Sequence, residues 1–185
     1  MSRAAIHRDG LVRTAMRLFR QKGYAATGLQ EILAESGAPR GSLYHYFPEG
    51  KESLGEAAVV LAGEMVAEML KELADKHKTP ADFVSAYCAQ MADWMTESDF
   101  CSGCPIATTV LETTPSSESI TRVGAQAFDS WLSIIAPVFA RAGISEREAK
   151  SKSELLVAAI EGSLVLARVR QSNEPILNIA KSMGI

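Results

Sequence analysis

The sequence predicts an all-α fold, with an N-terminal three-helix bundle that contains a helix-turn-helix and a larger C-terminal helical domain, about nine helices in total. Apolar residues recur at helical spacing almost throughout the 185 residues, and no segment shows the alternation that is typical of a strand. Hydrophobic residues make up 47% of the chain and charged residues 22%, which is the balance of a folded globular protein.

The first predicted helix runs from about Ala4 to Lys22, and Gly23 ends it. A single apolar face at helical spacing is formed by Leu11, Ala15, Leu18 and Phe19. A second, short helix opens at Thr27 and Gly28, and its inner face consists of Leu29, Ile32 and Leu33.

The third helix follows after a tight turn at Ser36 and Gly37. Pro39 fits its first turn, where a missing N–H is harmless, and Pro48 and Gly50 break it after Phe47. Two short helices joined by a turn that contains glycine form a helix-turn-helix.

Six further helices are predicted, over about residues 51–77, 80–98, 105–112, 117–142, 146–171 and 175–183. Thr79 with Asp82, and Ser145 with Glu148, are N-terminal capping pairs for two of them. The long helix from Lys51 is expected to bury one side, formed by Leu54, Ala58, Leu61, Met65, Met69 and Leu73.

Charge divides the chain into a basic head and an acidic body, although the net charge of the whole is -3. Residues 1–51 contain eight Lys and Arg against four Asp and Glu, and the remainder contains 11 against 18. This asymmetry is typical of a phosphate-binding module attached to a second domain. We therefore expect a DNA-binding domain over residues 1–50 and a ligand-binding and dimerisation domain over residues 51–185.

The third helix divides its side chains between two faces. Leu43, Tyr46 and Phe47 are expected to pack inward, while the outward set is Arg40, Gly41, Ser42, Tyr44 and His45. Consecutive helical side chains lie about 100° apart, so four successive rings cannot all face one core. An aromatic helix that merely packs into a core is therefore the weaker interpretation.

Each outward residue suits a contact with DNA. Arg40 can pair with a guanine edge, and Ser42 can bind a base or a phosphate. Tyr44 and His45 can donate to phosphate oxygens, and Gly41 admits close approach of the backbone. A further phosphate clamp is expected at Lys51 and the free amides beside it.

The strings LFRQKGYAATGLQEIL, ESGAPRGSLYHYF and GKESL closely resemble the DNA-binding domain of TetR-family repressors. The resemblance implies that the positions which commonly approach DNA are Thr27, Gly28, Arg40, Gly41, Ser42, Tyr44, His45 and Lys51. The chain departs from the usual pattern at Gly28, where a side-chain phosphate contact is lost, at Leu33 and Pro39, and by one extra residue in PEGK. CPIATTVLE resembles the branch of repressors of lincomycin and multidrug resistance genes, which respond to flavonoid or drug-like molecules.

The C-terminal part is rich in aromatic and methionine side chains, which either form plain core or line a cavity for a small-molecule inducer. The candidates are Phe83, Tyr87, Met91, Trp94, Met95, Ile106, Phe128, Trp131, Leu132 and Ile135. Glu112 and Glu161 lie within apolar helical runs, as hydrogen-bonded carboxylates or as ligand or interface contacts. Cys101 and Cys104 form a C-x-x-C, which suits a redox switch or half of a metal site, but no second cysteine pair exists. We therefore expect a structural or incidental role, no metal and no cofactor.

The segment LLVAAIEGSLVLARVR is apolar nearly all round and contains small residues that let another helix approach, Ala158, Ala159, Gly162 and Ser163. The resemblance places a four-helix dimer interface here. A homodimer implies an approximately palindromic operator.

The sequence therefore predicts a ligand-responsive transcriptional repressor that binds double-stranded operator DNA and is released by a hydrophobic or aromatic inducer. Tilting of the helix over residues 51–77 is the expected switch. A cytoplasmic location without membrane contact is expected from the N-terminal sequence and the lack of a long apolar run. The alternatives are an all-helical protein-protein adaptor without a role on DNA, and an enzyme, for which no catalytic motif is present.

Overall fold

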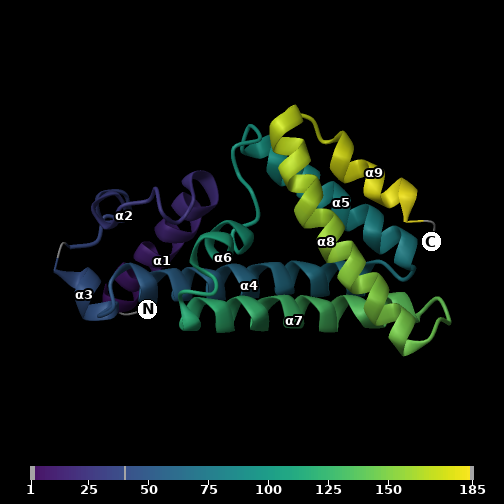
Figure 1. The fold of residues 1–185 in the computed structure, drawn as a ribbon, viewed down its shortest axis with the longest axis horizontal. Helices are drawn as coiled ribbons and strands as arrows, with labels where there is room; N and C mark the ends of the chain where they lie inside the picture. Colours follow the sequence, from purple (N-terminus) through teal and green to yellow (C-terminus); the bar gives the residue numbers. More distant parts are fainter. Residues whose placement is uncertain (1–2, 40, 184–185) are drawn as a thin grey trace. The chain divides into compact units, whose positions relative to one another are not determined.

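A computed structural model describes residues 3–39 and 41–183, and these residues form α-helices and no strand, as predicted. Along the chain (Figure 1) the helices are α1 (Arg3–Lys22), α2 (Leu29–Ser36), α3 (Ser42–Tyr46), α4 (Lys51–Lys76), α5 (Pro80–Glu97), α6 (Ala107–Thr113), α7 (Glu118–Ala140), α8 (Glu146–Arg170) and α9 (Glu174–Ser182). The prediction of an all-α fold with about nine helices is confirmed for the described residues.

The chain forms two compact units. The first, called the head unit here, comprises residues up to Glu64 together with Pro105–Ala127, and the second, the body unit, comprises Met65–Cys104 with the residues from Phe128 onward. Helices α4 and α7 each contribute to both units. The division into domains at residues 50 and 51 stays a prediction.

The head unit is organised around α1, which contacts α2, α3 and α6. Its core consists of Leu11, Val12, Ala15, Leu18, Phe19, Ile32, Leu33, Ala38, Leu43, Phe47, Leu54 and Ala58. Gly23 follows α1 with φ +88°, and Gly37 ends α2 with φ +66°, a left-handed conformation that side chains disfavour. The glycines predicted to end the first two helices therefore do so.

Local signals also fix the helix ends of the body unit. Thr79 accepts a hydrogen bond from the Asp82 amide at 3.1 Å, and Ser145 accepts one from the Glu148 amide at 3.3 Å. Both capping pairs are confirmed. Helix α5 packs against α8 and α9, and α8 also contacts α9.

The predicted buried side of α4 is wrong for Met65, which is 45% exposed. The buried residues instead follow a spacing of four along the helix, Leu54, Ala58, Ala62, Val66, Leu70 and Ala74. Small residues allow this face to pack closely: in the head unit, a Cβ at Gly63 would lie only 2.8 Å from the Cβ of Ala127 on α7. The buried face of α4 is therefore the one whose small residues allow α7 to approach closely, and not the one that carries the bulky Met65.

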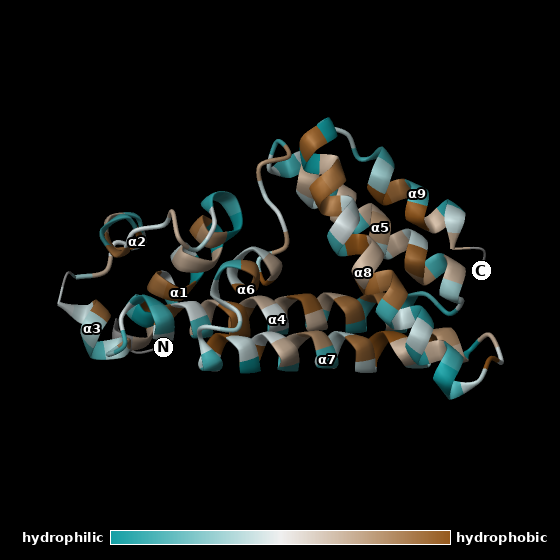
Figure 2. Cartoon of the chain, in the orientation of Figure 1, coloured by the Kyte–Doolittle hydropathy of each residue, from teal (hydrophilic) through white to brown (hydrophobic). Residues whose placement is uncertain are grey.

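Hydrophobic and hydrophilic residues alternate along each helix, as expected where one face is buried (Figure 2). Helix α7 is long and apolar enough to span a membrane by length and composition alone, a test that core helices of soluble proteins also pass. Its buried side chains within the protein include Ile120, Val123, Trp131, Ile135 and Phe139.

Candidate nucleic-acid interface

Helix α3 separates an inner from an outer face. Leu43 and Phe47 are buried, whereas Tyr44 is 64% exposed and His45 is also exposed. Tyr46 is half-buried and meets the His45 ring edge-on, with centroids 5.0 Å apart. The helix therefore presents a phenol and an imidazole to solvent from a base that its apolar side chains anchor in the core.

Open space surrounds Gly41, the residue directly before α3. Gly41 is exposed, and a Cβ built on it would meet nothing within 4 Å. Ser42 is half-buried, and its hydroxyl donates to the Pro39 carbonyl at 2.6 Å. Arg40, the predicted contact to guanine, lies outside the described residues.

The two predicted DNA contacts at the start of α2, Thr27 and Gly28, differ in their exposure to solvent. Thr27 is fully buried, and its hydroxyl donates to the Gly23 carbonyl at 2.7 Å. In this conformation the Thr27 side chain stabilises the turn between α1 and α2. Gly28 is exposed at the N-cap of α2 and supplies no capping side chain, so backbone amides are available there.

Lys51 begins α4 and reaches back to the same turn. Its ammonium donates to the Ala25 carbonyl at 3.2 Å and lies 4.6 Å from the centre of the Tyr24 ring. Burial lowers the pKa of Lys51, and the negative charge of Glu112 opposes this shift. Lys51 therefore holds the turn in the free protein, and its contact with phosphate stays a prediction.

Glu112 is a residue whose exact partner the sequence did not reveal. From the end of α6 its carboxylate accepts hydrogen bonds from the backbone amides of Tyr24 at 3.2 Å and Ala25 at 2.5 Å. The sequence offered a hydrogen-bonded carboxylate or a ligand or interface contact, and the structure shows the hydrogen-bonded one, although nothing local indicated a partner 87 residues away.

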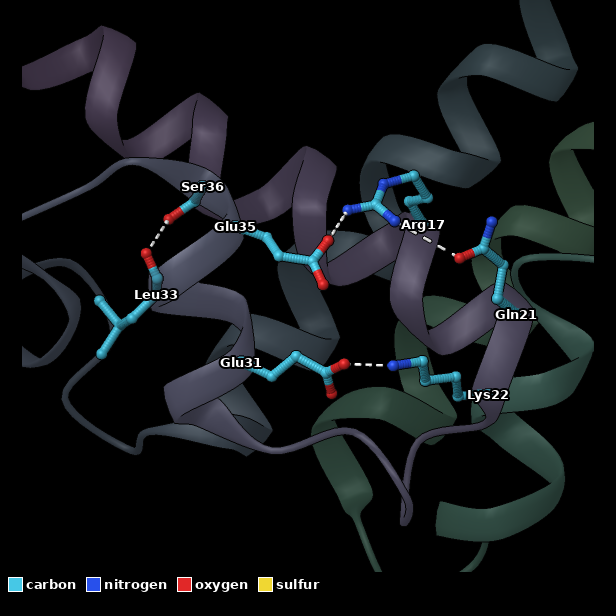
Figure 3. A network of polar contacts seen from close by, with 7 residues as sticks. All are labelled: Arg17, Gln21, Lys22, Glu31, Leu33, Glu35 and Ser36. Atoms are coloured by element: carbon cyan, nitrogen blue, oxygen red, sulfur yellow. Dashed lines mark hydrogen bonds and ion pairs between the residues drawn. The ribbon is translucent and has the colours of Figure 1, made fainter.

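Two basic residues of α1 are matched by acids of α2 (Figure 3). Arg17 pairs with Glu35, and Lys22 pairs with Glu31, on partly exposed side chains. These pairs join the first two helices of the head unit. They also neutralise part of the positive charge that the sequence assigned to DNA binding.

Two family models match the chain. Residues 11–58 match the bacterial regulatory proteins of the tetR family, and residues 80–182 match the C-terminal domain of the LmrA/YxaF-like transcriptional regulators. The chain belongs to the TetR family. The predicted resemblance is thereby confirmed, including its branch.

Individual relatives agree with this membership. The chain is 34% identical to the HTH-type transcriptional regulator YxaF of Bacillus subtilis over 178 residues, which is 96% of this chain and 93% of the relative. It is 32% identical to LmrA of the same organism, with 94% and 92% of the two chains covered. A TetR regulatory protein from Rhodobacter sphaeroides shares the fold, with a TM-score of 0.86, 21% identity and coverage of 95% and 96%.

This TetR-family chain is therefore a DNA-binding transcription regulator with a helix-turn-helix, and not an enzyme. An adaptor without a role on DNA is set aside by the same family membership.

The predicted inducer-contacting residues lie mostly in the body unit, and Ile106 lies in the head unit. Most are buried within the chain, and Trp94, Phe128 and Leu132 are half-buried. The Phe83 and Tyr87 rings lie 6.3 Å apart between centroids, and the Phe128 and Trp131 rings lie 5.1 Å apart. Their contact with an inducer stays a prediction.

A half-buried carboxyl, that of Glu161, lies in the body unit as well. Burial raises the pKa of Glu161, and a hydrogen bond with Cys104 opposes this shift. Burial also raises the pKa of Tyr87 well above its ordinary value, and the charge of Glu161 adds to this. All three cysteines are free thiols: Cys88 and Cys104 are buried, and Cys101 is exposed.

A groove of about 630 Å³ lies between the second half of α7 and the start of α8, within the body unit. Leu132 is the one predicted inducer contact among its lining residues. The other lining side chains are mostly small or apolar, as at Ala136, Pro137, Ala140 and Ala149.

Proposed function

We propose that this regulator is a homodimeric repressor that binds a palindromic operator through α2 and α3 and is released by a hydrophobic or aromatic inducer. The observation that carries the proposal is the division of α3, which exposes Tyr44 and His45 while Leu43 and Phe47 are buried. The Tyr44 phenol and the His45 imidazole can donate hydrogen bonds to phosphate oxygens, and an exposed helix face can bring both into a major groove. Gly41 and Ser42 continue the proposed contact surface, with Gly28 and Lys51 at its edge. Contacts from Arg40 and from the buried Thr27 are proposed on the family resemblance alone.

Dimerisation is supported by an uncovered apolar stripe on α8. Leu155, Val165, Leu166 and Val169 are between 47% and 79% exposed, and Ala158 and Gly162 lie exposed between them. A Cβ on Gly162 would meet nothing within 4 Å, so this chain itself leaves the space open. A second copy that packs its own α8 there would bury the stripe and fix the spacing of two α3 helices.

The inducer proposal rests on the body unit. On α5 the Phe83 ring lies 6.3 Å from the ring of the buried Tyr87, and the pKa of the Tyr87 phenol is raised by burial and by the charge of the half-buried Glu161. Aromatic rings together with a phenol and a carboxyl suit a largely apolar inducer that carries a hydroxyl group, which the two polar groups would orient. A cytoplasmic location follows from the proposed role on DNA.

Binding to the duplex upstream of the protein's own gene tests the proposal. By fluorescence anisotropy we expect a steep loss of affinity as salt rises, because phosphate contacts release counterions. Tyr44→Ala should weaken binding about tenfold or more while the far-UV circular dichroism stays that of the parent protein. A parent protein that binds this duplex no better than an unrelated one would refute the repressor proposal.

The dimer has its own test. Leu155→Asp should shift the protein to monomer in sedimentation velocity, because it places a charge in the proposed interface. Leu177→Asp makes the same change at an exposed leucine of α9 and should leave the mass unchanged. Equal masses for the two variants would contradict the α8 interface.

A further inference from the structure

The turn between α1 and α2 is held by a carboxylate from a distant helix. Glu112 lies near the end of α6, and each of its two oxygens accepts one backbone amide of the turn, from Tyr24 and from Ala25. A carboxylate that accepts two neighbouring amides fixes both the position and the orientation of the peptide that donates them. All of these groups belong to the head unit.

The turn is shaped to admit this carboxylate. At Gly23 a Cβ would lie 2.4 Å from the nearer oxygen of Glu112, well inside van der Waals contact. The φ of +88° at the same residue also disfavours any side chain. Glycine therefore satisfies two separate requirements of the contact.

A cation holds the opposite side of the turn. The Lys51 ammonium donates to the carbonyl of Ala25, while the backbone amide of Ala25 donates to Glu112. Thr27 completes the turn through its hydrogen bond to Gly23, and α2 begins two residues later. The start of α2 is thus set by one side chain from α6 and one from α4.

We propose that Glu112 is a positioning residue for DNA binding, which holds the helix-turn-helix in the orientation that fits the operator. The inference rests on the proposed function, because it assigns a role in operator binding to a residue that does not touch DNA. Since α6 carries Glu112, any displacement of α6 acts on the start of α2 through this carboxylate.

The direction in which operator affinity changes when the negative charge of Glu112 is removed tests the proposal. General electrostatics predicts that removing a negative charge strengthens DNA binding. Glu112→Gln should do the opposite and weaken binding to the upstream duplex about fivefold to tenfold, because the amide group can accept from only one of the two backbone donors. Binding to an unrelated duplex should stay within about twofold of the parent, since phosphate contacts are not changed.

Glu118→Gln is the matched control. It removes the same charge from an exposed acid of α7, in the same unit and outside the turn. Its operator affinity should equal or slightly exceed that of the parent. Glu112→Asp keeps the charge but shortens the side chain, and it should also weaken operator binding, which covers the case in which Glu112→Gln does not fold.

Amide hydrogen exchange gives a readout that does not depend on DNA. In Glu112→Gln the amides of Tyr24 and Ala25 should exchange about fivefold faster or more. If both Glu112 variants bind the operator as tightly as the parent, the positioning role is refuted while the repressor proposal stands. If the parent binds no upstream duplex, the proposed function fails and the inference falls with it.

Discussion

Replacing Gly23 with alanine separates backbone strain from the loss of a specific contact. The left-handed conformation at φ +88° costs a residue with a Cβ about 1 to 2 kcal/mol. The new methyl group would also lie 2.4 Å from an oxygen of Glu112, so the carboxylate must leave at least one of its two amides. For a partly exposed carboxylate that loss is about 1 to 2 kcal/mol, which brings the total to about 2 to 4 kcal/mol.

Gly37→Ala is the control for strain alone. Gly37 also has a positive φ, +66°, and lies in the same unit, but its Cβ would meet nothing within 4 Å. Its substitution should therefore cost only the backbone term of about 1 to 2 kcal/mol. Urea unfolding, followed by circular dichroism at one fixed protein concentration, measures both free energies of unfolding.

A double-mutant cycle completes the experiment. In a Glu112→Ala background the carboxylate is absent, so Gly23→Ala should cost no more than Gly37→Ala does. Equal costs for Gly23→Ala in the two backgrounds would show that the Glu112 contact contributes nothing to the stability of the turn. The reasoning about close approach would then be wrong.

Two further predictions concern titratable groups of the body unit. Because the pKa of Glu161 is raised in the folded state above its ordinary value of 4.5, the free energy of unfolding that depends on it is largest at low pH and is lost as the pH rises through the raised pKa. Glu161→Gln should therefore gain stability relative to the parent between pH 4.5 and pH 7.5 in urea unfolding, and a constant difference across that range contradicts the assignment. Cys101 should react rapidly with iodoacetamide at about pH 8, whereas Cys88, buried and with a pKa raised to about 11, should not. Mass spectrometry locates the label, and rapid labelling of Cys88 in the folded protein refutes its burial.

The sequence predicted best those features that neighbouring residues determine. Thr79 and Ser145 cap their helices because a hydroxyl and an amide three residues away meet without help from the rest of the chain. The outward Tyr44 and inward Leu43 follow from helical spacing alone.

Side-chain partners that are distant in sequence were not predictable in the same way. The apolar pattern on α4 pointed to Met65, but the close contact between Gly63 and Ala127 rotates the buried face toward small residues. Likewise, Thr27 and Lys51 are two of the predicted DNA contacts, and in the structure both hold a turn that Glu112 reaches from another helix. Such partners depend on how helices pack, which a single sequence does not encode locally.

The pairing of Arg17 with Glu35 and of Lys22 with Glu31 has a consequence for how the protein searches a genome. Lysines and arginines that are already paired with acids of the protein release few counterions from DNA. The affinity of the protein for non-specific DNA is therefore lower than a count of its lysines and arginines implies. With a low non-specific affinity, a smaller fraction of the protein molecules is bound at non-specific sites. Under the proposed function, the choice of one DNA sequence over others then depends mainly on the short helix α3.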